Sequence, residues 1–229
     1  MKNILIGIVR KLIKALSLTP ESKPDGGINL SGIQHARKQL IRIFVVLGFA
    51  MLMFHQSTWP PESIVYLSLT RAGVATVVAA IAARVWIRGH LGYRRLQSFV
   101  SDGPYSVVRH PLYLSSMVGT AGIGAQSGSI IMMFICLLPI WVIFNRVAQI
   151  EEVEMLARFG QEYESYLART PRFIPRFSQW AIAQEITTES SIVMHSFRNS
   201  SNFALSIPIF MAIEWAQRAS ILPVLLRLP

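Results

Sequence analysis

Two apolar runs in the middle of the chain are joined so closely that they have to fold back on each other. They are LYLSSMVGTAGIGA (112–125) and GSIIMMFICLLPIWVIFN (128–145). A helix needs about 20 mostly apolar residues to cross a bilayer, and backbone polar groups in the hydrocarbon must be satisfied within the protein. The two runs therefore predict a tight helical hairpin in a membrane. Pro139 predicts a kink in its second arm.

Two further apolar runs precede the hairpin. They are LIRIFVVLGFAMLMFHQ (40–56) and SIVYLSLTRAGVATVVAAIAARVWI (63–87). The chain is 52% hydrophobic and 15% charged, whereas soluble domains contain about 25% charged residues. We therefore expect an all-α integral membrane protein with four to five transmembrane helices.

The chain divides into three parts by composition. Residues 1–32 predict an amphipathic surface helix, with cations opposite its apolar residues, followed by a linker that contains proline and glycine. Residues 33–177 form the predicted membrane core. Residues 178–229 predict a polar linker and an apolar helix that Pro208 and Glu214 interrupt. We expect this last helix to be re-entrant or interfacial rather than a simple fifth crossing.

The basic residues are distributed unevenly around the apolar runs. The connections 57–62 and 124–129 contain no lysine or arginine, although the chain carries a formal charge of +10. Lysine and arginine concentrate on the cytoplasmic side of membrane proteins. The N-terminus, the connection 88–111 and the residues after 146 are thus predicted to face the cytoplasm. The positive charge is expected to meet anionic lipid rather than nucleic acid.

The hairpin brings two polar motifs to the same membrane face. RHP (109–111) precedes its first arm, and EE (151–152) follows its second. His110 can donate and accept hydrogen bonds near neutral pH, and Arg109 and Arg146 can each bind a carboxylate in a bidentate way. Each motif alone is also typical of a helix start at a membrane surface. Together they predict a pocket for a small polar molecule beside the lipid.

Other features favour packing over chemistry. Cys136 is the single cysteine, so the sequence predicts neither an intrachain disulfide nor a cysteine-based metal site, and no metal is expected. The stretch GTAGIG (119–124) lies inside an apolar helix, where small residues let two helices approach closely. An aromatic stripe with helical spacing runs through residues 151–166, and PRFIP (171–175) predicts an extended strap that could cover the pocket.

Several of these motifs together resemble a known family. GPYSVVRHPLY (103–113) and EEVEMLARFGQEYESYLARTPRFIP (151–175) are similar to the signature of the isoprenylcysteine carboxyl methyltransferase family, whose wider superfamily includes phospholipid N-methyltransferases. The resemblance covers about residues 84–177. It implies a helical membrane enzyme that binds S-adenosylmethionine at its cytoplasmic face. Thr170 departs from the pattern, since many members have valine there.

The resemblance also assigns roles by position. Arg146 is implied to orient the acceptor. An amine acceptor would also have to lose a proton, which His110 or a glutamate could take. The residues implied to bind the cofactor are His90, Gln97, Ser98, Phe99, Val100, Tyr105, Arg109, His110, Pro111, Leu112, Tyr113, Glu151 and Glu152.

The expected function is transfer of a methyl group from S-adenosylmethionine to a lipophilic or small acceptor. The resemblance leaves open an isoprenylcysteine carboxylate, a lipid amine or a small thiol, and therefore transfer to oxygen, nitrogen or sulfur. The alternatives are an NADPH-dependent sterol-type reductase, which also lacks a Rossmann fingerprint, and a non-catalytic membrane scaffold or lipid-binding protein. The sequence does not define the oligomeric state.

Overall fold

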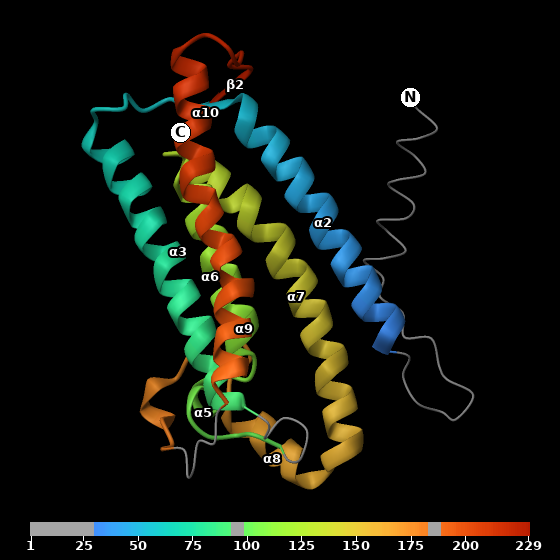
Figure 1. The fold of residues 1–229 in the computed structure, drawn as a ribbon. Helices are drawn as coiled ribbons and strands as arrows, with labels where there is room; N and C mark the ends of the chain where they lie inside the picture. Colours follow the sequence, from blue (N-terminus) through green and yellow to red (C-terminus); the bar gives the residue numbers. More distant parts are fainter. Residues whose placement is uncertain (1–29, 93–98, 183–188) are drawn as a thin grey trace, which may run out of the picture.

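The computed structural model describes residues 30–92, 99–182 and 189–229, and it shows an elongated bundle of helices (Figure 1). The expected N-terminal surface helix therefore lies outside the described residues. The long helices are α2 (Leu30–Phe54), α3 (Ile64–Leu91), α6 (Pro111–Ala125) and α7 (Ile130–Phe159). The shorter elements are β1 (His55–Ser57), α5 (Pro104–Val107), α8 (Gln161–Arg169), η1 (Phe177–Gln179), α9 (Ser190–Ser200), η2 (Ser201–Leu205), α10 (Ser206–Arg218) and β2 (Leu226–Leu228).

Two of the described helices, α3 and α7, are long and apolar enough to cross a membrane. The apolar part of α2, Ile41–Phe54, is shorter. Many large apolar side chains on these helices are exposed, including Val46 on α2 and Leu138 on α7. A helix that is apolar around most of its circumference suits a lipid environment. The structure confirms the helical class, and it supports a membrane location.

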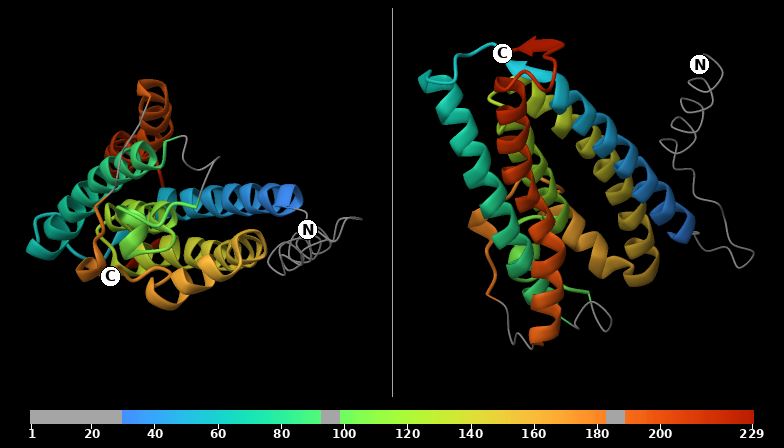
Figure 2. Two further views of the ribbon diagram at one scale, coloured as in Figure 1. Left: turned by 90° about the horizontal axis from the view of Figure 1, so that it is seen from below. Right: turned by 45° about the horizontal axis from the view of Figure 1, so that its top comes forward.

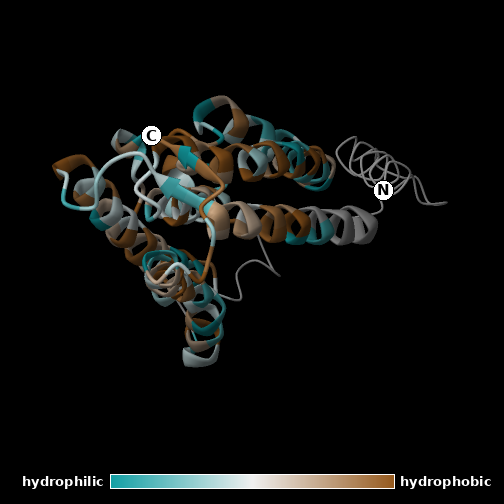
Figure 3. Ribbon diagram, turned by 90° about the horizontal axis from the view of Figure 1, so that it is seen from above, coloured by the Kyte–Doolittle hydropathy of each residue, from teal (hydrophilic) through white to brown (hydrophobic). Residues whose placement is uncertain are grey.

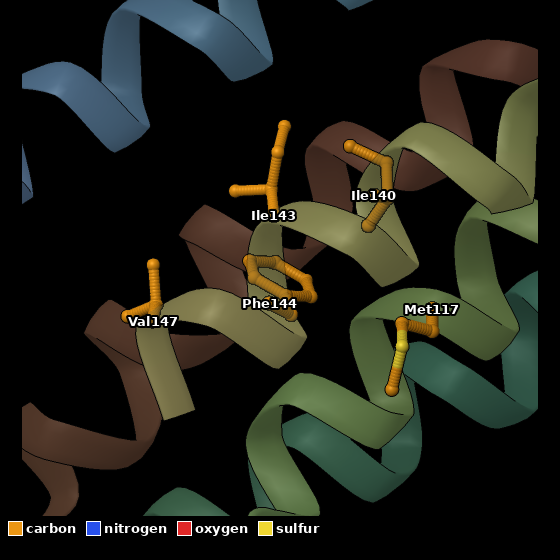
Figure 4. Packing of buried hydrophobic residues seen from close by; sticks show 5 residues of the cluster. All are labelled: Met117, Ile140, Ile143, Phe144 and Val147. Atoms are coloured by element: carbon orange, nitrogen blue, oxygen red, sulfur yellow. The ribbon is translucent and has the colours of Figure 1, made fainter. Parts of the chain in front are cut away.

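The hairpin of α6 and α7 has the expected geometry. Ser129 caps α7, because its side chain accepts a hydrogen bond from the Met132 backbone N–H. Along the hairpin, Met117 of α6 packs with Ile143 and other buried residues of α7 (Figure 4). The open ends of the two arms consequently lie together, at the end of the bundle that also carries α5 and α8 (Figure 1). We call this the α5–α8 end, and the opposite one the β1–β2 end.

Small residues bring α3 and α6 into close contact. A Cβ atom added to Gly73 would lie 2.7 Å from the carbonyl oxygen of Gly122, and one added to Gly122 would lie 2.9 Å from the carbonyl oxygen of Gly73. Both neighbours are backbone atoms, which cannot rotate away. The GTAGIG stretch thus serves helix packing, as predicted.

This contact gives a first testable prediction. Gly122→Val should lower the melting temperature of the purified protein, because overpacking of this kind costs about 1–3 kcal/mol. Gly48→Val on α2 is the matched control, since a Cβ atom there meets nothing within 4 Å. Equal melting temperatures for the two variants would contradict the close packing of α3 on α6.

The C-terminal helices lie against the bundle, and their interpretation as a re-entrant or interfacial segment stays a prediction. Helices α9 and α10, joined by η2, extend along the bundle from the α5–α8 end to the β1–β2 end (Figures 1 and 2). Ser200 accepts a hydrogen bond from Arg84 Nε of α3 (3.3 Å), and Ser206 accepts one from Gln126 Nε2 at the far end of α6 (2.9 Å). The path runs the whole length of the neighbouring helices without turning back.

The polar residues that interrupt the apolar pattern lie near the C-terminal end of α10. Glu214 and Arg218 form an ion pair (2.6 Å) on the last turns of α10, at the end of the bundle. Gln217 Nε2 donates to the carbonyl oxygen of His55 (3.0 Å), and β1 pairs with β2 in parallel. Figure 3, seen from this end, shows the two strands lying over the helices, with β1 coloured as hydrophilic. The charges thus lie beyond the apolar stretch of α10 and do not break it.

Candidate functional site

The hairpin brings the Arg-His-Pro and Glu-Glu motifs together at the α5–α8 end. Pro111 is the first residue of α6, where its missing N–H costs nothing, and His110 precedes it. His110 Nε2 lies 3.2 Å from Glu152 Oε1, and its Nδ1 lies 4.0 Å from Glu151 Oε2. Residues some forty positions apart thus share one site.

Glu152 is the centre of a cluster of charged groups. Its carboxylate is 8% exposed. Oε1 accepts hydrogen bonds from Arg109 Nη1 (3.1 Å), His110 Nε2 (3.2 Å) and Arg172 Nε (3.0 Å), while Oε2 accepts one from Arg172 Nη2 (2.6 Å). We call Arg109, His110, Glu152 and Arg172 the Glu152 cluster. Because protein groups already surround this carboxylate, its role in the structure is to hold its neighbours in place.

Arg109 also fixes the end of α8. Its Nε donates to the carbonyl oxygen of Thr170 (2.5 Å) and its Nη2 to that of Leu167 (2.6 Å). Its backbone N–H donates to Pro171 (2.9 Å). The Arg109 side chain therefore donates to two backbone carbonyl groups and also forms an ion pair with the buried carboxylate of Glu152. This explains why an arginine, with its fork of donors, suits the position.

Residues 170–182, which we call the strap, include the segment 171–175 that we expected from the sequence to cover the pocket. Arg176 N–H donates to the carbonyl oxygen of Val107 (3.0 Å), and Gly103 N–H donates to that of Ala181 (2.9 Å). Ala181 N–H in turn donates to Ser106 Oγ (3.0 Å). The strap is thereby joined by hydrogen bonds to residues 103–107, immediately before the Arg-His-Pro motif.

Arg172 of the strap was not among the predicted site residues. In addition to its two hydrogen bonds to Glu152, it donates from Nη1 to Asn145 Oδ1 (3.2 Å). The hydrogen bond to Glu152 raises the pKa of the Arg172 guanidinium above its usual value. This arginine lies within the motif PRFIP. The motif predicted an extended backbone but not the partner of the Arg172 side chain.

Glu151 has a different environment from its neighbour. The Tyr113 hydroxyl donates to its Oε1 (2.6 Å), and 28% of its side chain is exposed. The Tyr113 ring stacks on Phe144, with 4.7 Å between ring centroids, and on His110, with 5.5 Å. Phe173 of the strap lies beside His110, at 6.1 Å. Glu151 is thus a partly accessible carboxylate beside aromatic rings.

His90 lies against the turn before α5. It is buried, and its Nε2 is 3.1 Å from Asp102 Oδ1. Gly103 has a φ of +55°, and a Cβ atom there would collide with the His90 ring. Glycine is thus required at this position both for its backbone conformation and for space. The contacts of His90 position the turn that leads to the Arg-His-Pro motif.

The aromatic stripe of α7 and α8 packs beneath the site. Phe99 contacts the rings of Phe159, Tyr163 and Tyr166, and Val100 is buried beside it in sequence. Burial raises the pKa of Tyr163 to about 12 and also raises the pKa of Tyr166. These phenols are therefore neutral at physiological pH, as core residues should be.

Tyr166 gives a second testable prediction. Its hydroxyl donates to the carbonyl oxygen of Tyr105 (2.7 Å), and the residue is 2% exposed. Tyr166→Phe should lower the free energy of unfolding by about 1–3 kcal/mol, because a buried carbonyl loses its donor. Ser165→Ala, at an exposed position of the same helix, is the control and should have no measurable effect in thermal unfolding. Equal stability of the two variants would contradict this role.

The predicted residues do not all lie together. Arg109, His110, Tyr113, Glu151 and Glu152 do. Leu112 points its carbonyl toward α3, where Arg84 Nη1 donates to it (3.2 Å). Arg146 is exposed on α7, and no contact ties it to the Glu152 cluster in the described part of the chain. Gln97 and Ser98 fall outside the described residues.

An apolar helical hairpin with a cluster of acid, histidine and arginine side chains at one end indicates a helical membrane protein with a polar site. Comparison with known proteins identifies its family. Residues 64–162 match the model of the family described as phospholipid methyltransferase. A "nickel-cobalt-cadmium resistance protein" of Alcaligenes xylosoxydans xylosoxydans is 30% identical over 82% of this chain and 87% of its own length. The chain belongs to the phospholipid methyltransferase family.

Two other relatives match shorter regions. A "cobalt-zinc-cadmium resistance protein" of Cupriavidus metallidurans is 33% identical over 60% of this chain and 62% of its own. A "protein-S-isoprenylcysteine O-methyltransferase" of Schizosaccharomyces pombe is 32% identical over 33% of this chain and 32% of its own. No solved structure matches. The family and the last relative support a membrane methyltransferase, which agrees with the resemblance seen in the sequence.

Proposed function

We propose that the protein transfers a methyl group from S-adenosylmethionine to a lipophilic or small acceptor at the α5–α8 end of the bundle. The main support is that two neighbouring glutamates have different surroundings. Both carboxylate oxygens of Glu152 already accept hydrogen bonds, whereas Glu151 is partly exposed beside three aromatic rings and His110. Family membership points to methyl transfer, and the site geometry indicates where it would occur.

The residues at this site fit the chemistry of S-adenosylmethionine. A carboxylate such as Glu151 can accept hydrogen bonds from hydroxyl or ammonium groups. The ring face of Phe173 suits a flat base or a positive charge, whereas the Tyr113 ring is already stacked on Phe144 and His110 and contributes through its hydroxyl group. Glu151, Tyr113 and Phe173 would hold the donor, which supplies an electrophilic methyl group on a sulfonium.

His110 is positioned to handle a proton. Because Glu152 accepts a hydrogen bond from Nε2, a neutral His110 keeps its proton there and leaves Nδ1 free as a base. An amine acceptor would have to lose a proton, and Nδ1 could take it. A carboxylate or thiolate acceptor would need orientation only, which can supply about 7–11 kcal/mol. Arg146, which is exposed, remains the proposed orienting group for an anionic acceptor.

The location favours an acceptor that reaches the site from the membrane. Exposed apolar side chains cover α2, α3 and α7, and the strap also exposes Ile174, Phe177, Trp180 and Ile182, whereas α8 is more polar. A soluble donor could enter from the aqueous side while a hydrophobic acceptor approaches through lipid. We infer, from the distribution of positive charge, that the α5–α8 end and the N-terminus face the cytoplasm.

Titration of the purified full-length protein in detergent tests the cofactor. Isothermal calorimetry with S-adenosylmethionine should give saturable binding, and titration with NADPH should give none. Binding of NADPH alone would support the reductase alternative instead. Absence of binding to either would favour a scaffold. Incubation with methyl-labelled donor and separate pools of prenylated cysteine, lipid amines and thiols would then identify the acceptor.

A further inference from the structure

A cavity lies at the β1–β2 end, at the opposite end of the bundle from the proposed methyl-transfer site. Its volume is about 490 Å³, within the range of small-molecule sites. One wall comes from α10 and the other from the first turns of α3, and these helices diverge toward this end (Figures 1 and 2). The residues 55–61, between α2 and α3, complete it.

The deeper part of this cavity is apolar. Val74 of α3 faces Ile207, Phe210 and Met211 of α10 across it. Met211 is 67% exposed, so the cavity reaches the outer surface of the bundle on the side where α10 carries other exposed apolar residues. In a membrane that surface meets hydrocarbon chains. An apolar cavity that opens to hydrocarbon suits an acyl chain.

The rim of the cavity is polar and positively charged. It contains Glu214, Arg218 and Arg227. Arg218 is paired with Glu214, whereas Arg227 lies exposed on β2, which leaves one net positive charge. Arginine is well suited to phosphate because its planar fork can donate two hydrogen bonds. The rim therefore complements an anionic head group.

One ring nitrogen of His55, in the wall, is buried without a partner among the described residues, although the ring also has a hydrogen bond with the Leu228 backbone. His55 is 4% exposed, and its Nε2 makes no hydrogen bond within the part of the chain that the structure describes. Unpaired buried polar atoms are rare in native proteins. A head-group hydroxyl in the cavity, after a small movement of the ring, could supply this hydrogen bond.

The roof of the cavity is held in place without a ligand. Pairing of β1 with β2 fixes Arg227, and Leu225 N–H donates to the carbonyl oxygen of Phe54 (2.9 Å). Ser129 Oγ donates to the carbonyl oxygen of Pro229 (2.8 Å), which ties the same segment to α7. A preformed site binds with a smaller entropic cost.

We propose that this cavity binds one anionic phospholipid, with a chain between α3 and α10 and the phosphate beside Arg227 and Arg218. The ligand belongs to the membrane and is separate from the methyl acceptor at the other end. Its expected effect is to hold α10 against α3 at the end where the two helices diverge.

Native mass spectrometry of the full-length protein tests the proposal. The protein is equilibrated in detergent with phosphatidylglycerol or phosphatidylcholine, and retained lipid is counted. We expect one retained phosphatidylglycerol and much less phosphatidylcholine. Thr70→Trp, which places a large ring in the cavity, should abolish retention. Ala72→Trp, on the exposed side of the same helix, should leave it unchanged.

A second variant separates lipid binding from folding. Arg227 is an exposed residue of β2. Arg227→Glu should reduce the retention of phosphatidylglycerol at least about fivefold, since a basic residue at a lipid surface contributes about 1 kcal/mol. Arg158→Glu, exposed at the opposite end, should not. Equal retention by the Thr70→Trp and Ala72→Trp variants, or by Arg227→Glu and wild type, would overturn the proposal. Equal retention of both lipids would overturn its anionic specificity.

Discussion

Replacement of Glu152 by glutamine is expected to lower the free energy of unfolding by about 3 kcal/mol, because breaking a buried ion pair leaves uncompensated charge. Glu152 accepts hydrogen bonds from Arg109, His110 and Arg172. The amide keeps the volume of the side chain but loses the negative charge that three donors share. The measurement is thermal unfolding of the purified protein, which should show a lower melting temperature.

Glu154→Gln is the matched control. Glu154 lies on the same helix, and within the described residues it takes part in no ion pair. Its replacement should leave the melting temperature within the error of the measurement. If Glu152→Gln were as stable as this control, the Glu152 cluster would not be holding the strap and the hairpin together.

Glu151→Ala should act on binding rather than on folding, whereas His110→Ala should act on binding and also remove one of the hydrogen bonds to Glu152. Each is expected to weaken the affinity for S-adenosylmethionine about tenfold or more, since a hydrogen bond to a charged group contributes about 1.5–3 kcal/mol. Calorimetry gives the affinity, and circular dichroism shows whether the helices persist. Val153→Ala, on an exposed position of α7, serves as the control.

The contrast between the two glutamates makes these predictions separable. Loss of Glu152 should change stability first, and loss of Glu151 should change affinity first. Unchanged affinity in both Glu151→Ala and His110→Ala would refute the placement of the donor beside Tyr113. A Glu151→Ala variant that unfolds would instead assign it to the same structural role as its neighbour.

The sequence predicted the hairpin and the proximity of its two polar motifs well, because both follow from the short connection between the two apolar helices. A loop of a few residues between two apolar helices leaves no other arrangement in a membrane. The glycine contact between α3 and α6 was also predictable, since small residues at helical spacing have few other uses in an apolar helix.

The differences arise where a side chain has two possible surroundings. Glu214 was interpreted as an interruption of an apolar helix, and the structure places it in an ion pair with Arg218 on the last turns of α10. Arg172 was interpreted as part of a strap, and its bidentate contact with Glu152 depends on the distance between strap and hairpin. The periodicity of one segment gives no information about the distance between the strap and the hairpin.

The strap has a consequence for biosynthesis. Arg109, His110 and Glu152 leave the ribosome before Arg172 does. Glu152 therefore has two of its three partners, Arg109 and His110, before Arg172 is available. The newly inserted hairpin should therefore be stable enough to persist, yet open on one side, until the last arginine arrives. Attachment of the strap to the hairpin would then be among the final events of maturation.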